Sequence, residues 1–148
     1  KIEELCEAEL KRSERYSNEL SVIFFDVNDF KIINDKLGHH KGDEVLIKIA
    51  SVISQNIRTT DYFGRWGGDE FLIVLPQTNL YKTEHLVKIL ENILTTINFD
   101  LKMNRKISCS FGLSQYEKND TLDSFLKRAD ESMYVNKYNY RQSKLQQL

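Results

Sequence analysis

Two adjacent glycines, Gly67 and Gly68, interrupt strand-like sequence near the middle of the chain and constrain its fold more than any other feature. Residues 61–63 before them have strand-like composition, and the continuous apolar run 71–75 after them ends at Pro76. Paired glycines suit a tight type I′ turn because both of its central residues need positive φ, which glycine adopts without a Cβ clash. The pattern therefore predicts a β-hairpin.

Two carboxylates, Asp69 and Glu70, stand at the end of this turn, immediately before a strand that we expect to be buried. They would repel each other there and lose hydration, so a positive group should lie opposite them. The usual candidates are a basic side chain, which is a structural role, or a divalent cation, which prefers oxygen ligands. The turn alone leaves both interpretations open.

A third carboxylate, Asp26, follows the apolar segment 20–25 and precedes a predicted helix. If that segment is a strand beside the hairpin, Asp26 and Asp69 or Glu70 face one cation from two parts of the chain. Metal-assisted phosphoryl or nucleotidyl transfer requires such a site, because the cation offsets phosphate charge and lowers the pKa of an attacking hydroxyl. The structural alternative makes Asp26 a helix N-cap, a role that aspartate fills well.

Helical patterns alternate with strands along the rest of the chain. We expect a charged, mostly exposed helix at 1–18, a short helix at 29–37 with Gly38 as its left-handed C-cap, and a third helix starting near Gly42 or Asp43. A helix at 79–97, a strand at 106–114 and a last helix at 121–140 follow. Their predicted apolar faces are Leu46, Ile49, Ile53 and Ile57; Leu86, Leu90, Ile93 and Ile97; Ile107, Cys109, Phe111 and Leu113; and Leu122, Phe125, Ala129 and Met133. This order predicts an α/β fold in which helices cover a mixed, largely antiparallel central sheet.

Length and charge set further bounds. The 148 residues suit a single domain with one substantial core. The formal net charge of −1 gives no general electrostatic case for a nucleic acid polymer or an acidic membrane surface, so phosphate binding must come from local groups. No apolar run approaches the roughly twenty residues of a membrane span, and no signal peptide is visible, so we expect this segment to be cytoplasmic.

Five motifs resemble, in order and spacing, the GGDEF family of diguanylate cyclases. They are Asp26-Val27-Asn28-Asp29-Phe30-Lys31, Asn34-Asp35, Gly38-His39, Gly42-Asp43-Glu44 and Arg65-Trp66-Gly67-Gly68-Asp69-Glu70-Phe71. The resemblance extends from about Leu20 to Lys137. It implies a palm-like nucleotidyl cyclase fold and a single GGDEF domain at 1–148, which we expect to be excised from a longer bacterial regulatory protein. The missing regulatory domain is then fused upstream, and the parent protein could be membrane-anchored.

The resemblance implies that the substrate is GTP. Asn34 and Asp43 match the family's guanine-reading pair, and an aspartate at the second position favours GTP over ATP; the structural alternative for Asp43 is an N-cap. The other substrate-binding positions that it implies are Lys31, His39, Gly67, Gly68, Lys137 and Arg141. The glycines would let phosphates approach the backbone, and the basic residues would contact phosphates, although a solvated basic face is the structural alternative for Lys137 and Arg141.

The last helix departs from the family near these residues. Asn136 stands where a small residue is usual, Tyr140 where glycine is usual, and Gln142 where asparagine is usual. The departure weakens the assignment of Arg141 more than that of Lys137.

The implied metal ligands are Asp26, Asp69 and the Val27 carbonyl, with Glu70 as the neighbouring carboxylate. Asp69 and Glu70 are also the catalytic candidates, because Glu70 either supports metal binding or helps to deprotonate the 3′-hydroxyl. Two Mg²⁺ ions per half-site are expected, with Mn²⁺ as a possible substitute.

A regulatory motif precedes the hairpin. Arg58 and Asp61 resemble the family's RxxD inhibitory site, which binds the product cyclic di-GMP. Arginine grips a phosphate or a guanine edge bidentately, and aspartate accepts from guanine N1 and N2. An Arg and an Asp three residues apart are otherwise usually a surface ion pair.

The resulting hypothesis is a diguanylate cyclase that condenses two GTP molecules into cyclic di-GMP and two pyrophosphates. Each subunit binds one GTP, so catalysis requires a homodimer, and product binding at the RxxD site inhibits it. The alternatives are a catalytically silent receptor for GTP or cyclic di-GMP, and a different nucleotidyl cyclase or polymerase palm.

Overall fold

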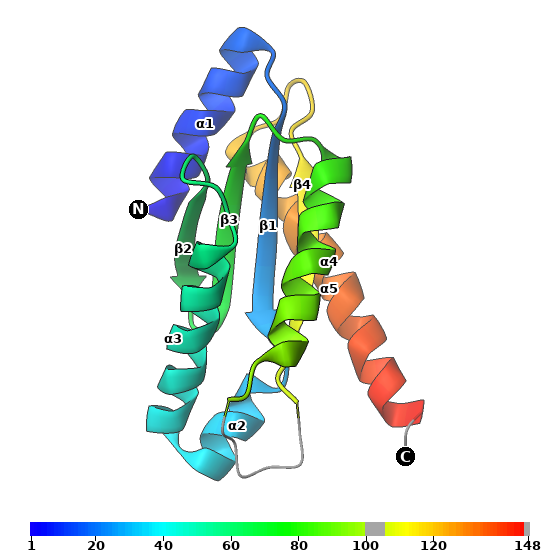
Figure 1. Ribbon diagram of the computed structural model, residues 1–148. Helices are drawn as coiled ribbons and strands as arrows, with labels where there is room; N and C mark the ends of the chain where they lie inside the picture. The colour runs from blue at the N-terminus through cyan, green and yellow to red at the C-terminus, as the bar shows by residue number, and fades with distance from the viewer. Residues whose placement is uncertain (100–105, 147–148) are drawn as a thin grey trace.

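The computed structural model of the protein describes residues 1–99 and 106–146 (Figure 1). The helices and strands of these residues follow one another as α1 (Ile2–Tyr16), β1 (Leu20–Val27), α2 (Phe30–Leu37), α3 (His39–Gln55), β2 (Tyr62–Gly67), β3 (Glu70–Pro76), α4 (Leu80–Thr96), β4 (Cys109–Gln115) and α5 (Leu122–Gln146).

The described strands form one sheet in the order β2-β3-β1-β4. Its three pairings are all antiparallel, with β1 between β3 and β4. The predicted α/β class, with helices covering a largely antiparallel sheet, is therefore confirmed.

Helices cover both faces of this sheet (Figure 1). On one face, Ile23 and Phe25 of β1 join a core with side chains of α2, α3 and α4. On the other, Val22 and Phe24 join a core with α1 and α5. Every residue of β1 is buried, because the strand is covered on both faces. This two-sided burial explains its continuous apolar run.

The predicted hairpin is present, but its turn differs from the expected type. Gly67 pairs with Glu70, so Gly68 and Asp69 occupy the corner. Of these two, Gly68 alone has positive φ, at 54°, and the register shifts between Arg65 and Gly67. The expectation of a type I′ turn, which needs two positive φ values, is therefore wrong. The Arg65 Nε donates to the Gly68 carbonyl at 2.6 Å and braces the corner.

The start of α3 also differs from the prediction. The helix begins at His39 rather than at Gly42 or Asp43. Gly42 lies inside α3, where the Asn34 side chain of α2 occupies the space that a Cβ would take, with Oδ1 at 1.9 Å from that position. Gly38 ends α2 with φ 89° and ψ 160°, a positive φ but not the left-handed helical conformation that we expected.

Two other helices show where apolar patterns were misleading. Thr83, Val87, Leu90 and Leu94 are buried in α4. Of the predicted face, Leu90 belongs to the core and Leu86 and Ile97 pack against it, whereas Ile93 is not part of this cluster. Ile57 packs against the core from beyond the end of α3. For α5, burial of Phe125, Ala129 and Met133 is confirmed, but the helix continues to Gln146, well past the predicted end.

Polar side chains of α5 cover the outer edge of β4 in the described sheet. Arg128 donates to the Gln115 carbonyl at 2.7 Å, and Ser132 Oγ accepts from the Leu113 N–H at 3.1 Å. Asn136, one of the departures from the family pattern noted above, donates to the Phe111 carbonyl. A helical spacing of four residues thus matches alternate backbone groups of the strand.

A membrane span was not expected, and among residues 1–99 and 106–146 no helix combines the length and apolar character needed to cross a bilayer.

Candidate active site

Asp26 and Glu70 lie directly opposite each other across β1 and β3. Residues directly opposite in an antiparallel pair point to the same face of the sheet, and here that face carries α5. The Gly68 corner, the end of β1 and α2 lie together at one end of the sheet (Figure 1). The fold thus brings Asp26 and the acids of the hairpin together, as the sequence predicted.

The Asp26 carboxylate is almost fully buried, with its side chain 7% exposed. Its Oδ2 accepts from Lys137 Nζ of α5 at 2.5 Å, whereas its Oδ1 is buried and has no hydrogen-bond partner within residues 1–99 and 106–146. Burial raises the pKa of Asp26, the Lys137 contact opposes this shift, and the charges of Asp69 and Arg141 act in opposite directions. Because Asp26 lies within β1, and Asp29 is the N-cap of α2, the alternative of Asp26 as an N-cap is wrong.

Glu70 experiences a strongly negative environment. Its pKa is raised by burial and by the charges of Asp130, Asp26 and Asp69, in that order of size. Asp130 belongs to α5 and was missed in the sequence, where it is one of many charges on an amphipathic helix. Glu70 and Asp130 also line a cavity of about 580 Å³ with Phe24 and Trp66.

The carboxylate oxygens of Asp26, Asp69 and Glu70 are suitable ligands for a hard cation, but these residues do not form a closed coordination shell. Among the described residues, no three His, Cys, Asp or Glu side chains are gathered closely enough to hold a metal ion. The Asp26 Oδ1, which has no hydrogen-bond partner among the described residues, is nevertheless the donor type that Mg²⁺ prefers. Lys137 is a positive group near these acids, because it pairs with Asp26 and its charge acts to lower the pKa of Glu70.

Asn34 and Asp43 come together where α2 packs on α3. The Asn34 side chain lies against Gly42, and its Oδ1 is buried with no hydrogen-bond partner in the part of the chain that the structure describes. Asp43, the next residue, is exposed within α3. It is therefore not an N-cap, so its carboxylate is not committed to a helix start.

The other predicted substrate residues surround these two groups. Lys31 is exposed in the first turn of α2, and His39 is exposed at the first residue of α3. Gly67 and Gly68 are exposed, and a Cβ built on either would meet no described residue within 4 Å. The described residues thus leave space beside the corner.

Arg58 and Asp61 form a closely bonded pair at the opposite end of the hairpin. Asp61 accepts from the Arg58 guanidinium at 2.8 Å and from its backbone N–H at 2.8 Å, and Arg58 also donates to the Pro76 carbonyl and Thr78. The ion pair that the structural alternative predicts is therefore present, with the Asp61 side chain 2% exposed and that of Arg58 54% exposed. The hydrogen bond to Asp61 raises the pKa of Arg58 and holds it as a cation.

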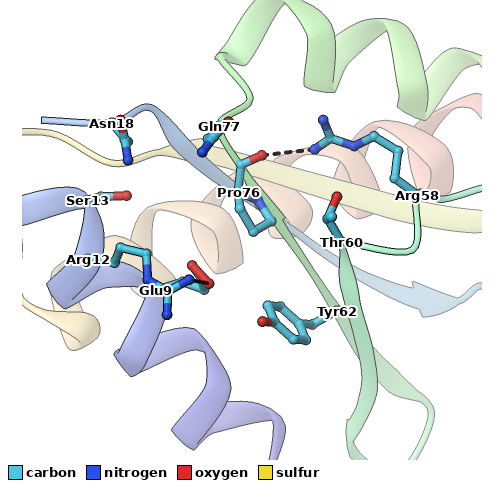
Figure 2. A pocket seen from close by; sticks show the side chains of 9 residues that line it. All are labelled: Glu9, Arg12, Ser13, Asn18, Arg58, Thr60, Tyr62, Pro76 and Gln77. Atoms are coloured by element: carbon cyan, nitrogen blue, oxygen red, sulfur yellow. Dashed lines mark hydrogen bonds and ion pairs between the residues drawn. The ribbon is translucent and has the colours of Figure 1, made fainter. Parts of the chain in front are cut away.

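Arg58 borders two cavities. One, of about 250 Å³, lies between α1 and β2 and is also lined by Arg12, Glu9 and Tyr62 (Figure 2). The other, of about 260 Å³, lies towards α4. The guanidinium therefore retains open space on either side of its contacts.

Comparison with known proteins agrees with this arrangement. The family model described as "Diguanylate cyclase, GGDEF domain" matches residues 1–143. Diguanylate cyclase DgcP of Pseudomonas aeruginosa is 34% identical over 134 residues, which are 90% of this chain and 20% of that protein. The chain thus spans about a fifth of the length of this relative.

Solved structures are similar as well. The active GGEEF domain of a diguanylate cyclase from Vibrio cholerae superimposes with a TM-score of 0.86 at 33% identity, covering 92% of this chain and 87% of that one. A microbial GGDEF domain described in a novel interaction mode with bis-(3′,5′)-cyclic di-GMP has a TM-score of 0.79 at 25% identity, covering 93% and 85%.

The fold is that of the palm-like nucleotidyl cyclase domains. The chain belongs to the GGDEF family of diguanylate cyclases.

Proposed function

We propose that this domain condenses two GTP molecules into cyclic di-GMP and two pyrophosphates. Among the described residues, three buried side-chain oxygens lack a hydrogen-bond partner, and two of them carry the proposal: Asp26 Oδ1 beside the hairpin acids and Asn34 Oδ1 beside Asp43; the third is Ser114 Oγ. A buried polar atom without a hydrogen bond costs about 1–3 kcal/mol, so it is retained where a ligand completes it.

The α2–α3 pair would bind the guanine. The Asp43 carboxylate accepts from guanine N1–H and N2–H₂, while the amide of Asn34 offers both a donor and an acceptor to the base edge. Adenine lacks this donor edge, so this pair favours GTP over ATP.

The end of β1 and the hairpin corner would bind the triphosphate. Asp26, Asp69 and the Val27 carbonyl would hold Mg²⁺, or Mn²⁺ in its place, with Glu70 in support. When bound, the cation offsets phosphate charge and lowers the pKa of the attacking hydroxyl. Lys31, Lys137 and Arg141 add positive charge, and the open space beside Gly67 and Gly68 accommodates phosphate oxygens.

In the reaction, the 3′-oxygen of each GTP attacks the α-phosphorus of the other, its proton is lost, and pyrophosphate leaves. Glu70 is suited to accept that proton because its raised pKa makes it a stronger base than an ordinary glutamate. Asp69 is the second candidate for this role.

Two subunits must therefore meet with their nucleotides face to face, since one domain binds one GTP. In the longer parent protein, a fused regulatory domain would promote this dimerisation by raising the effective concentration of the second subunit. We place the domain in the cytoplasm, where its substrate is made.

Arg58 and Asp61 are proposed to bind cyclic di-GMP and to inhibit the enzyme. The cavities on either side of the guanidinium provide space for a purine and a phosphate. Binding then requires that Arg58 exchange part of its present contacts for the ligand.

The competing function is a silent receptor that binds GTP or cyclic di-GMP without turnover. It has no need for Asp26, Asp69 and Glu70 to adjoin one another, which favours the cyclase.

The deciding experiment incubates the domain with GTP and Mg²⁺ over a range of protein concentrations and measures cyclic di-GMP and pyrophosphate by mass spectrometry. The cyclase forms both products at a rate per subunit that rises with protein concentration. Asp69→Ala abolishes turnover but retains cyclic di-GMP binding in calorimetry, and Glu84→Ala, which removes an exposed carboxylate from α4, changes neither. Nucleotide binding without product at every concentration favours the receptor.

A further inference from the structure

The C-terminal part of α5 is bound to the turn between β1 and α2. Tyr140 Oη donates to Asp29 Oδ2 at 3.0 Å, and Lys144 Nζ forms an ion pair with the same oxygen at 2.5 Å. Lys144 Nζ also lies 5.6 Å from the centre of the Tyr140 ring. We refer to Asp29, Tyr140 and Lys144 as the Asp29 latch.

The latch acts on a residue with an uncommon backbone conformation. Asp29 has φ 57° and ψ 28°, a left-handed conformation, and its side chain does not cap α2 although it stands at the N-cap position. Aspartate adopts this conformation more readily than most residues other than glycine. The two α5 side chains direct the Asp29 carboxylate towards α5 rather than towards the first turn of α2.

The turn that the latch fixes carries the proposed substrate groups. Asp26 precedes it at the end of β1, and α2 begins directly after it with Lys31 in its first turn. Lys137, Tyr140 and Lys144 follow one another at helical spacing, so one face of α5 contacts both Asp26 and Asp29. The position of α5 and that of the turn are thereby coupled.

From this geometry we infer that the Asp29 latch positions the β1–α2 turn for nucleotide binding, with Tyr140 and Lys144 as positioning residues. The inference rests on the proposed function, because the nucleotide is the GTP assigned to that turn. Without the latch, the turn and Lys137 lose their fixed relation, and GTP must order them when it binds. That ordering lowers affinity for the nucleotide more than it lowers turnover of the bound complex.

A plain stability role is the competing explanation, since the same contacts also tie α5 to the fold. The latch side chains are partly exposed, at 35% for Lys144 and 22% for Asp29, so the contacts are screened by solvent. A tie of this kind changes the melting temperature but leaves the affinity of the folded protein for nucleotide unchanged.

The test uses the double variant Tyr140→Phe/Lys144→Met, which removes the hydroxyl and the charge while keeping the bulk of both side chains. Two matched controls are Lys144→Arg, which keeps the charge, and Tyr138→Phe, which removes a hydroxyl from a tyrosine that is 56% exposed on the same helix. Affinity is measured with Mg²⁺ and a GTP analogue whose α,β-bridging oxygen is replaced by methylene, so that pyrophosphate cannot leave. Fluorescence of Trp66, the only tryptophan, reports binding beside the hairpin corner.

We expect the double variant to bind the analogue roughly tenfold more weakly, with the two controls within about twofold of wild type. In turnover assays KM rises and kcat changes little. Unchanged affinity together with a lower melting temperature overturns the inference and leaves a stability tie. If wild type binds the analogue but forms no cyclic di-GMP, the cyclase proposal fails while the affinities still decide the latch; if wild type does not bind it, both fail.

Discussion

Replacing Gly42 with alanine tests whether Asn34 binds the guanine base of GTP. The added Cβ would lie 1.9 Å from Asn34 Oδ1, 3.1 Å from its Cγ and 3.2 Å from Phe30 Cζ. An ordinary contact begins near 3.4 Å, so the amide oxygen must move by about 1.5 Å. The obstacle is the end of a flexible side chain rather than backbone, so the helices stay in place and Asn34 turns away.

The expected result separates stability from binding. Alanine favours a helix interior over glycine by about 1 kcal/mol, which offsets the cost of moving Asn34, so the free energy of unfolding changes by no more than about 1 kcal/mol. Loss of a hydrogen-bonding contact to the base costs about 1–3 kcal/mol, which is roughly 5-fold to 150-fold in affinity.

The assay combines urea denaturation with calorimetry of the α,β-methylene analogues of GTP and ATP in Mg²⁺. Gly42→Ala should lose GTP affinity and most of the preference for GTP over ATP, as should Asn34→Ala. Ser54→Ala, at an exposed position of α3, serves as the control for helix propensity. A folded Gly42→Ala protein with unchanged affinity and unchanged preference refutes the assignment of Asn34 to the base.

Three other substitutions probe the site, the packing and the regulation. Glu70→Gln should raise the free energy of unfolding at pH 7.5, because burial and neighbouring carboxylates raise the pKa of Glu70 and so penalise its charged form. This gain should shrink as the pH falls towards 4.5, the ordinary pKa of a glutamate. Equal gains at pH 7.5 and pH 4.5 in urea denaturation would contradict this explanation. Gly112→Ala should destabilise by about 3 kcal/mol or more in the same assay, because its Cβ would meet the Ala129 carbonyl at 2.1 Å and Met133 N at 2.2 Å, both backbone atoms that cannot turn aside. Arg58→Ala should weaken cyclic di-GMP binding at least tenfold and relieve product inhibition while leaving the initial rate with GTP unchanged; inhibition at the wild-type product concentration would place the inhibitory site elsewhere.

The hairpin and the position of Asp26 could be predicted because their signals are local. A glycine pair between apolar runs specifies a turn, and an aspartate after a continuous apolar run marks the end of a buried strand. The cross-strand pairing of Asp26 with Glu70 then follows once β1 and β3 are neighbours.

Other features depend on contacts between distant segments and left no local signal. Gly42 resembled a helix start, because glycine is unfavourable inside helices, but the Asn34 side chain takes the space of its Cβ. The predicted apolar face of α4 included Ile93 and missed Val87 and Leu94, because these residues have apolar neighbours in the sequence and only packing selects between them. The last turns of α5 carry no core stripe and are held by the polar contacts to Asp29.

The cover that Arg128, Ser132 and Asn136 provide for β4 also limits how this protein can associate. A β-strand of another molecule that approached the β4 edge would find the carbonyls of Phe111 and Gln115 and the N–H of Leu113 already hydrogen-bonded to α5. These contacts therefore hinder strand-by-strand association through the β4 edge. Proteolytic removal of α5 would expose that edge and would also remove Lys137.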